Sequence, residues 1–203
     1  MRYGKTYEVY RIPQKLIDAT LSHLDIENLK KAKVKVSPTE SEYSKKRSNS
    51  ITFIGNAEIK ARWLKVAQKT NKEMGWDFDL DSIESLQYGE YDITQEYAWH
   101  VDQHRHPYDN GRVRKMSFSV FLNDDYIGGE FDLEIHGPMA QPEQRYKTFS
   151  GAAGYGHKDN EKKGKISVND ALFFQSDYWH RVRPVRKGIR KSLVGWVLGP
   201  KFK

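Results

Sequence analysis

Apolar residues recur at helical spacing in two stretches near the beginning of the chain. The first covers residues 12–24, where Pro13 suits the opening turn of a helix. The second follows Asn56, a favourable N-cap, and stops at Gly75, a residue typical of helix ends. One face of this second stretch carries Ala57, Ala61, Leu64 and Ala67. We therefore expect two helices, with a polar connection and a short strand at Ser50–Ile54 between them.

From residue 83 onwards the spacing changes from helical to alternating. Segments 116–122 and 131–135 place apolar side chains at every second position, which predicts strands with one buried face. Segments 170–175 and 192–198 are dense apolar runs of strand length, which predicts strands buried on both faces. Helices followed by many strands indicate an α+β protein that is mainly β, with the sheet closed as a sandwich or barrel.

Composition limits the classes of protein to which the chain can belong. Its 203 residues fit one domain, and its 12 Tyr, 9 Phe and 5 Trp favour a folded core over disorder. No apolar run approaches the roughly 18 residues that a membrane helix needs, and the first residues lack the apolar segment of a secretory signal. Without cysteine there is no disulfide, thiolate nucleophile or cysteine-type zinc site. We expect a single cytoplasmic domain over residues 1–203 with no membrane association.

Two segments stand apart from the rest in composition. Residues 181–203 contain eight Lys and Arg and no acid, within a chain of net charge +7. Such a basic segment suits a nucleic acid or an acidic partner, or consists of solvated charges that flank strands. Residues 136–165 show neither the helical nor the alternating spacing of apolar residues. They are rich in Gly, Gln and Lys, which is typical of a functional loop or a disordered one.

One group of residues has the composition of an iron site. His100 and Asp102 are two positions apart where the alternation begins, so in a strand their side chains point the same way. His180 can add a second imidazole, and two histidines with one carboxylate are the ligand set of non-haem Fe(II) oxygen chemistry. Arg190 follows ten residues later, and its guanidinium can clamp a carboxylate in a bidentate fork. A cosubstrate with one carboxylate for iron and one for arginine would be 2-oxoglutarate.

A His-x-Asp pair alone is a weak signal, but its context is specific. Four ordered blocks within about residues 80–200 resemble the 2-oxoglutarate- and Fe(II)-dependent dioxygenases, most closely their prolyl 4-hydroxylase-like branch. The blocks are LQYGEY, YAWHVDQ, RKMSFSVFLNDDYIGGEFDL and NDALFFQSDYWHRVRPVRKGIRKSLVGWVLGP. The resemblance implies a double-stranded β-helix, or jelly roll, over residues 80–203, supported by a helical region over residues 1–79.

The same resemblance implies the roles of individual residues. His100, Asp102 and His180 would hold Fe(II), Arg190 would hold 2-oxoglutarate, O2 would be the second substrate, and ascorbate a further cofactor. Additional contacts to the cosubstrate would come from Tyr88, Tyr97, Ser192 and Trp196. The spacing from Tyr88 to His100 is longer than the family usually shows, so Tyr91 stays an alternative to Tyr88.

Three aromatic residues beside the predicted ligands have two interpretations. Trp99, Tyr178 and Trp179 could form dry walls that exclude water from a reactive intermediate, or they could belong to the ordinary core.

The activity that the resemblance implies is hydroxylation of a substrate C–H bond with release of succinate and CO2. The leading substrate is a prolyl residue in a peptide or protein, as in procollagen-proline-type 4-hydroxylation, with the loop at 136–165 closing over it. The alternatives are the same iron chemistry on a nucleic-acid base, which the basic segment 181–203 would favour, or on a free amino acid. A jelly-roll binding protein without catalysis is disfavoured, because such a protein has no reason to keep all four chemistry-bearing residues at these spacings.

Overall fold

The computed structural model describes residues 5–31, 47–135, 145–151 and 163–201. Within these ranges the chain forms two helices, α1 (Gln14–Leu21) and α2 (Ala57–Met74). The strands in the same ranges are β1 (Tyr7–Arg11), β2 (Lys30–Lys31), β3 (Ser50–Ile54), β4 (Ser82–Ile83), β5 (Leu86–Tyr91), β6 (Tyr97–His100), β7 (Arg112–Phe121), β8 (Ile127–Gly128), β9 (Phe131–Glu134), β10 (Tyr146–Ser150), β11 (Lys163–Lys165), β12 (Asp170–Gln175), β13 (His180–Val182), β14 (Val185–Lys187) and β15 (Arg190–Pro200).

Both helices form where the apolar spacing predicts them. The side chain of Asn56 accepts a hydrogen bond of 3.0 Å from the backbone N–H of Ile59, which caps the start of α2. Gly75 ends the helix with a φ of 66°, a left-handed conformation that glycine adopts without steric cost. Helix α1 is shorter than predicted and ends at Leu21.

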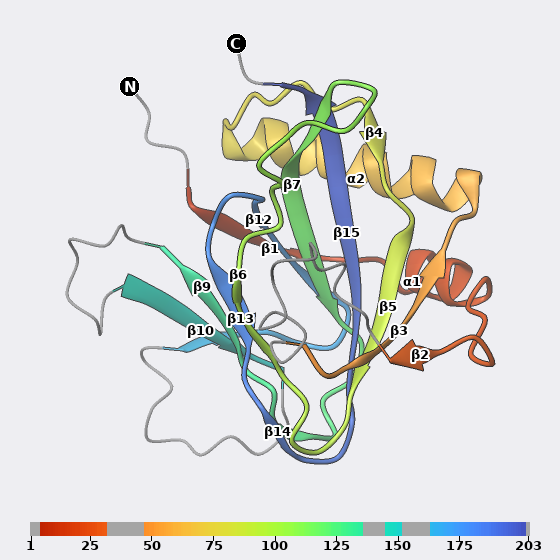
Figure 1. Cartoon of the computed structure of the whole chain (residues 1–203), viewed down its shortest axis with the longest axis vertical. Helices are drawn as coiled ribbons and strands as arrows, with labels where there is room; N and C mark the ends of the chain where they lie inside the picture. Colours follow the sequence, from red (N-terminus) through yellow and green to blue (C-terminus); the bar gives the residue numbers. More distant parts are fainter. Residues whose placement is uncertain (1–4, 32–46, 136–144, 152–162, 202–203) are drawn as a thin grey trace.

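The large sheet has eight strands among the described residues, in the order β1-β12-β7-β15-β5-β3-β2, with β4 paired to β15 (Figure 1). All of these pairs are antiparallel. Strand β15 lies between β7 and β5 and therefore forms the centre of the sheet. Strands β1, β2 and β3 come from the first 79 residues, so this region contributes strands to the sheet in addition to its two helices.

The helices cover one face of the large sheet. Trp63 of α2 stacks on Phe118 of β7 with ring centroids 4.8 Å apart, and its indole N–H donates to Thr20 of α1 at 2.9 Å. Gly195 of β15 lies beneath the Phe118 ring, where a Cβ atom would come within 2.2 Å of the ring. The absence of a side chain at position 195 thus allows this aromatic layer to pack closely.

A smaller sheet, in the order β11-β10-β9-β13-β6, faces the other side of the large sheet. The space between the two sheets is filled by a second apolar cluster that includes Phe121, Phe131, Leu133, Phe149, Leu172 and Phe174. Helices, large sheet and small sheet thus form three layers (Figure 1). This arrangement confirms the mainly β jelly roll with supporting N-terminal helices.

Two expectations from the sequence need correction. Strand β7 was expected to have one solvated face, but Ser117 and Ser119 are 0% and 3% exposed because that face looks into the interior between the sheets. The segment 136–165 was expected to be irregular, but β10 and β11 lie within it. Residues 136–144 and 152–162, which include most of the predicted closing loop, lie outside the described residues. No helix in the described part of the chain is long and apolar enough to cross a membrane.

Candidate functional site

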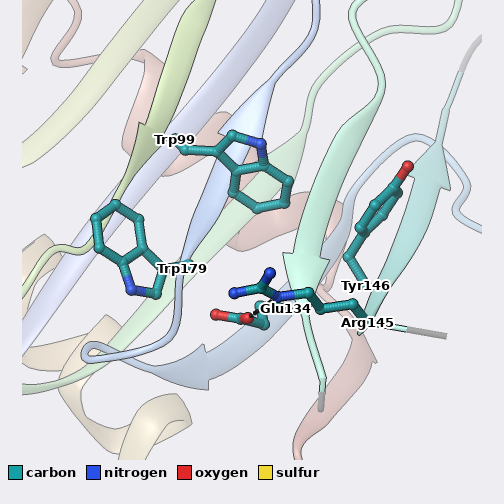
Figure 2. A pocket seen from close by; sticks show the side chains of 5 residues that line it. All are labelled: Trp99, Glu134, Arg145, Tyr146 and Trp179. Atoms are coloured by element: carbon teal, nitrogen blue, oxygen red, sulfur yellow. Dashed lines mark hydrogen bonds and ion pairs between the residues drawn. The ribbon is translucent and has the colours of Figure 1, made fainter. Parts of the chain in front are cut away.

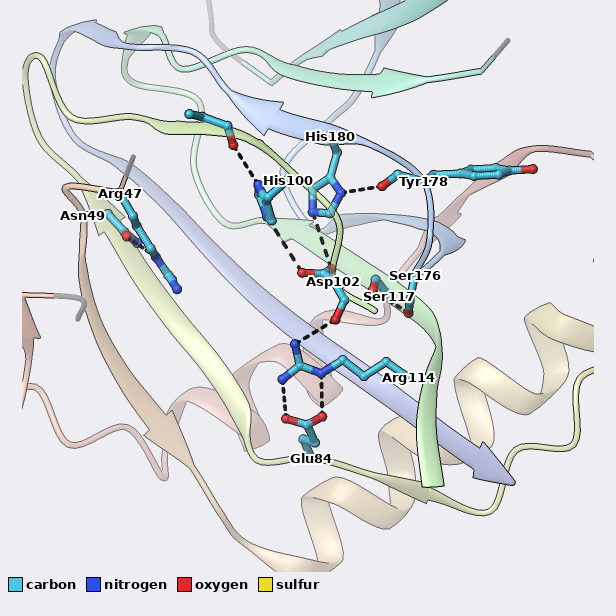
Figure 3. Close-up of polar contacts among 11 residues, drawn as sticks. Arg47, Asn49, Glu84, His100, Asp102, Arg114, Ser117, Ser176, Tyr178 and His180 are labelled. Carbon is cyan, nitrogen blue, oxygen red and sulfur yellow. Dashed lines mark hydrogen bonds and ion pairs between the residues drawn. The ribbon is translucent and has the colours of Figure 1, made fainter. Parts of the chain in front are cut away.

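The structure brings His100, Asp102 and His180 together at one end of the small sheet (Figure 3). His180 opens β13 and pairs in register with His100 at the end of β6. Asp102 lies in the turn after β6, because its backbone N–H and that of Gln103 both donate to the carbonyl of Ser176 at 2.9 Å. The expected continuous strand through residue 102 is therefore wrong. The side chains nevertheless converge: the Nε2 atoms of His100 and His180 lie 3.8 Å and 3.4 Å from the Asp102 carboxylate oxygens.

Backbone carbonyls orient both imidazoles. The Nδ1–H of His100 donates to the carbonyl of Ala98 at 2.8 Å, and that of His180 donates to the carbonyl of Tyr178 at 2.9 Å. These bonds hold the tautomer in which Nε2 carries the lone pair, and both Nε2 atoms face Asp102. The three possible ligand atoms lie within 4.8 Å of one another, so a single metal ion could contact all of them.

Burial and neighbouring charge favour the protonation states that a metal requires. Burial of His100, reinforced by His180, lowers the pKa of His100 to about 3, so its ring is neutral at pH 7. Burial alone would raise the pKa of Asp102, but His180, His100 and Arg114 outweigh this effect and hold the pKa below its usual range. A neutral imidazole beside an ionised carboxylate is ready to bind a divalent cation without releasing a proton.

A cavity between the two sheets joins this triad to Arg190. The Arg190 side chain is 1% exposed, and its Nε and one Nη atom have no hydrogen-bond partner among the described residues. The rings of Tyr91 and Phe121 lie 5.4 Å and 5.0 Å from its guanidinium carbon. Gly129, with a φ of 61°, makes room for the arginine, because a Cβ atom there would lie 2.8 Å from Arg190 Cδ. A buried guanidinium with unpaired donors is costly, so this cavity favours a ligand that brings a carboxylate.

Three of the four predicted additional contacts line the cavity. These are Tyr97, Ser192 and Trp196. The ring of Tyr97 also stacks on His100, with centroids 3.6 Å apart and planes 16° apart. The prediction for Tyr88 is wrong, because strand alternation turns it toward the helix side of the sheet, where it packs in the core and donates to Glu90 at 2.7 Å. Tyr91, the alternative, lines the cavity.

No pattern in the sequence points to Arg47, which lies in a polar connection. Arg47 is half-buried and lines the same cavity as the triad. Its guanidinium carbon lies 4.7 Å from the centroid of the Tyr97 ring, and its Nε donates to Asn49 at 2.8 Å. Arg47 thus places a second positive charge in the cavity, close to the predicted metal ligands.

A second residue that sequence reasoning missed is Arg114 of β7. Its Nε and Nη2 atoms donate to the two carboxylate oxygens of Glu84, both at 2.6 Å, and its Nη1 donates to the carbonyl of Asp102 at 3.2 Å (Figure 3). The guanidinium carbon also lies 4.1 Å above the ring of Trp196. Arg114 therefore links the backbone of a predicted metal ligand to Glu84, between β4 and β5, and to Trp196 of β15.

The three aromatic residues beside the ligands do not form walls of the cavity. Trp99 and Trp179 line a separate groove, and Trp179 is 49% exposed. Tyr178 is partly buried against the cluster between the sheets. Trp99 points outward because adjacent residues of a strand point to opposite faces and its neighbour His100 points inward.

Comparison with protein families agrees with this geometry. Residues 86–198, more than half of the chain, match the family model described as the 2OG-Fe(II) oxygenase superfamily. A PKHD-type hydroxylase of Gloeothece citriformis (strain PCC 7424) is 33% identical over 123 residues, which are 57% of this chain and 43% of that protein. A PKHD-type hydroxylase of Synechococcus elongatus is 34% identical over 118 residues, with the same coverage. The match thus spans less than half the length of these curated relatives.

Solved structures share the fold. A prolyl-4-hydroxylase of Pseudomonas putida aligns with a TM-score of 0.62 and 17% identity, covering 98% of this chain and 94% of that one. A viral collagen prolyl hydroxylase of Paramecium Bursaria Chlorella virus-1, solved as a 2OG complex, aligns with a TM-score of 0.61 and 17% identity, covering 97% of both chains. At this level of identity the likeness concerns the fold alone.

Proposed function

Because the chain belongs to the 2OG-Fe(II) oxygenase superfamily, we propose that it hydroxylates a C–H bond of a prolyl residue in a peptide or protein. The reaction consumes 2-oxoglutarate and O2, places one oxygen atom on the substrate carbon and the other in succinate, and releases CO2. The observation that carries the proposal is the buried guanidinium of Arg190, two of whose nitrogens have no hydrogen-bond partner among the described residues, in the cavity that also holds the histidine–aspartate triad. These two features provide the two ends of a site for a dicarboxylate beside a metal.

The residues present fit the cofactors of this family. His100 and His180 offer neutral Nε2 atoms and Asp102 offers a carboxylate, which suits Fe(II). When bound there, Fe(II) supplies the activation of O2 that no side chain can provide. Arg190 would receive the distal carboxylate of 2-oxoglutarate, and Ser192 lines the same cavity. A need for ascorbate stays a prediction from the family resemblance, and a cytoplasmic location stays a prediction from the composition of the chain.

The remaining cavity residues would exclude water and orient the substrate. Tyr97 covers one face of the His100 ring, and Phe131 and Phe174 pack against His180 with ring centroids 5.5 Å and 4.8 Å away. These rings shield the metal ligands from solvent, which protects a reactive centre from unproductive reactions.

The choice of a prolyl substrate, and of its C4 atom, draws on the relatives. The curated relatives are named PKHD-type hydroxylases, and two solved structures with this fold are prolyl hydroxylases. A third, from Trichoplax adhaerens, was solved with a peptide fragment and aligns with a TM-score of 0.54 and 14% identity. A peptide or protein substrate is therefore the one we test first.

The proposal is tested in two stages. Anaerobic calorimetry should show one equivalent of 2-oxoglutarate bound to the Mn(II)-loaded protein and none bound without metal or to His180→Ala. Aerobic assays with Fe(II) should then show succinate release that increases with proline-containing peptides, and the peptide should gain one oxygen atom. Metal-dependent binding without peptide turnover would disprove the prolyl substrate and keep the oxygenase centre. No binding at all would disprove both.

A free amino acid is the second candidate substrate, and Arg47 is the observation that favours it. Its guanidinium lines the cavity, its Nε donates to Asn49, and its terminal nitrogens can meet a substrate carboxylate. If this candidate is right, free amino acids should stimulate succinate release, and Arg47→Met should abolish the stimulation. Stimulation by peptides with blocked C-termini, undiminished in Arg47→Met, would exclude it.

A further inference from the structure

A groove of about 370 Å³ lies on the small sheet and is separate from the triad cavity. It is lined by Trp99 of β6, Tyr146 of β10, Trp179, and the ion pair between Glu134 and Arg145 (Figure 2). The rings of Trp99 and Tyr146 meet edge to face with centroids 5.7 Å apart. Trp179 is 49% exposed and lines the groove together with Trp99 and Tyr146, so the groove presents clustered aromatic surface to solvent.

Strand alternation places this groove on the outer face of the small sheet. On β13, His180 and Val182 face the large sheet, and Arg181 between them points outward to lie 4.8 Å from the Trp99 ring. On β9, Leu133 packs in the core between the sheets, and its neighbour Glu134 lines the groove. The groove and the triad therefore occupy opposite faces of the same strands.

The charges around the groove disfavour a cationic ligand. Glu134 accepts a hydrogen bond of 2.7 Å from Arg145, so its charge is already neutralised. The second acid of this face, Asp132, is fully buried and accepts from both Arg181 and Arg183. Glu130 also acts on Arg183 and pairs with Arg186, so among the described residues four arginines stand against three acids. The excess of positive charge would repel a lysine or a methylated ammonium.

The polar groups that line the groove are mostly donors. The indoles of Trp99 and Trp179 can only donate, the hydroxyl of Tyr146 can donate, and Arg145 can only donate. The Glu134 carboxylate, the strongest acceptor in the lining, is engaged by Arg145. A complementary ligand therefore combines flat or ring-shaped apolar groups with acceptors, and needs no donors of its own.

We propose that this groove binds a proline-rich segment of the protein substrate, an inference that rests on the proposed prolyl hydroxylation. Proline has no N–H, and a polyproline II helix has no internal hydrogen bonds, so its carbonyls need external donors. Its rings pack against tryptophan and tyrosine, as in other aromatic grooves that recognise such segments. The segment is already extended, so little conformational entropy is lost when it binds.

The position of the groove allows one substrate chain to reach both sites. Strand β6 lies at the end of the small sheet and carries His100 facing inward and Trp99 facing the groove. Arg47 bridges to Tyr97 at the start of β6, so a substrate would pass around the His100 end of this strand. From the cavity to the outer face it would cover about 10 Å, or three to four residues at about 3.1 Å per residue. The groove would thus hold prolines several residues away from the one that is hydroxylated.

Binding is tested first without catalysis. A fluorescein-labelled oligoproline of about eight residues is titrated into metal-free protein and followed by anisotropy, with a glycine–serine peptide of equal length as the control. We expect saturable binding of oligoproline only. Trp179→Ala should weaken it about tenfold through the loss of one stacked ring, and Trp179→Phe by less. Ile26→Ala, which truncates an exposed apolar side chain outside the groove, is the matched control and should bind normally.

Two results would overturn the proposal at this stage. One is equal oligoproline affinity in Trp179→Ala, Tyr146→Ala and the unaltered protein. The other is absence of oligoproline binding together with salt-sensitive binding of oligothymidylate that Trp179→Ala removes, which would assign the groove to single-stranded nucleic acid.

Kinetics separate this inference from the proposed function. With a long peptide that carries a proline-rich flank, Trp179→Ala should raise KM about tenfold and keep kcat, and with a short peptide that has one proline it should change neither. If no peptide is hydroxylated, but oligoproline binds and Trp179→Ala abolishes this binding, the assignment of the groove is supported and the proposed function is disproved. If long peptides are hydroxylated with the same KM by Trp179→Ala and by the unaltered protein, the proposed function is supported and the groove assignment is disproved.

Discussion

Arg190 and Asp132 are both buried charges, but they lie in different regions and have different surroundings. Asp132, on the outer face of the small sheet, accepts hydrogen bonds from Arg181, Arg183 and Thr148 at 2.7, 2.8 and 2.7 Å. Arg190, in the cavity between the sheets, leaves its Nε and one Nη atom unpartnered within the described chain. The contrast separates a charge whose partners belong to the fold from one whose partner must come from outside.

Replacing Arg190 should have the largest effect on ligand binding, and the effects on binding and on stability should differ in sign. In Arg190→Met the affinity for 2-oxoglutarate should fall about 100-fold, because two charge-assisted hydrogen bonds are lost. The free energy of unfolding of the ligand-free protein should stay equal or rise by about 1 kcal/mol, because an uncompensated buried charge is removed. Calorimetry and urea unfolding measure the two quantities. A destabilised variant with normal cosubstrate affinity would show that Arg190 is structural.

Asp132→Asn should show the reverse behaviour. Removing the charge leaves Arg181 and Arg183 without their shared partner, and the free energy of unfolding should fall by about 3 kcal/mol. This value is at the lower end for buried pairs because both arginines are about one-third exposed and water can reach them. The affinity for 2-oxoglutarate, measured at a temperature where the variant is folded, should not change. A loss of affinity comparable to that of Arg190→Met would remove the distinction between the two charges.

Arg114 lies between these extremes, because it is fully paired and also touches the candidate site. Arg114→Lys cannot keep the bidentate contact to Glu84 together with the bond to the Asp102 carbonyl, so Mn(II) affinity should fall about tenfold. Electron paramagnetic resonance of free Mn(II) gives this affinity directly. The matched control is Arg112→Lys on the same strand, where the arginine pairs with Asp81 at 2.8 Å and is more exposed. Equal affinities in the two variants would contradict a positioning role for Arg114.

The smallest expected effect concerns pH. The pKa of His100 is lowered to about 3 in the folded protein, so between about pH 6.5 and pH 3 the unfolded chain binds a proton that the folded one does not. The contribution of His100 to the free energy of unfolding is thus present at neutral pH and is lost as the pH falls. From pH 7.5 to 5.5 the metal-free protein should lose about 1 kcal/mol through this residue. Urea unfolding at both values tests it, and His100→Asn should show a smaller difference. An equal difference in His100→Asn would assign the pH dependence to other groups.

The sequence predicted most of the fold because its apolar spacing is unambiguous in α2 and in the central strands of the large sheet. Asn56 and Gly75 cap the two ends of α2 as expected, and the dense apolar runs at 170–175 and 192–198 are buried strands. The alternating pattern in β7 predicts a solvated face, but a buried polar side chain and one that faces water look the same in a sequence. Ser119 lines the cavity, and Ser117 is buried against the hydroxyl of Ser176.

For the candidate site, the sequence located the residues that a recurrent spacing marks. His100, Asp102, His180 and Arg190 could be found in this way, and the structure brings them into one cavity. Arg47 could not be found, because it reaches the cavity from a segment about fifty residues before the triad and no pattern surrounds it. Tyr88 and Tyr91 could not be separated, because only the strand register decides which of them faces the metal side.

The central position of β15 has a consequence for synthesis of the protein. Until residues 190–200 leave the ribosome, β5 and β7 have no strand between them, and each presents an unpaired edge to other chains in the cell. Strand β1 likewise waits for β12, more than 150 residues later. The native contacts are thus dominated by distant segments, which predicts slow folding that is completed only after β15 has been synthesised. The nascent chain therefore cannot assemble the complete site, Arg190 included, before nearly all of the described residues have been made.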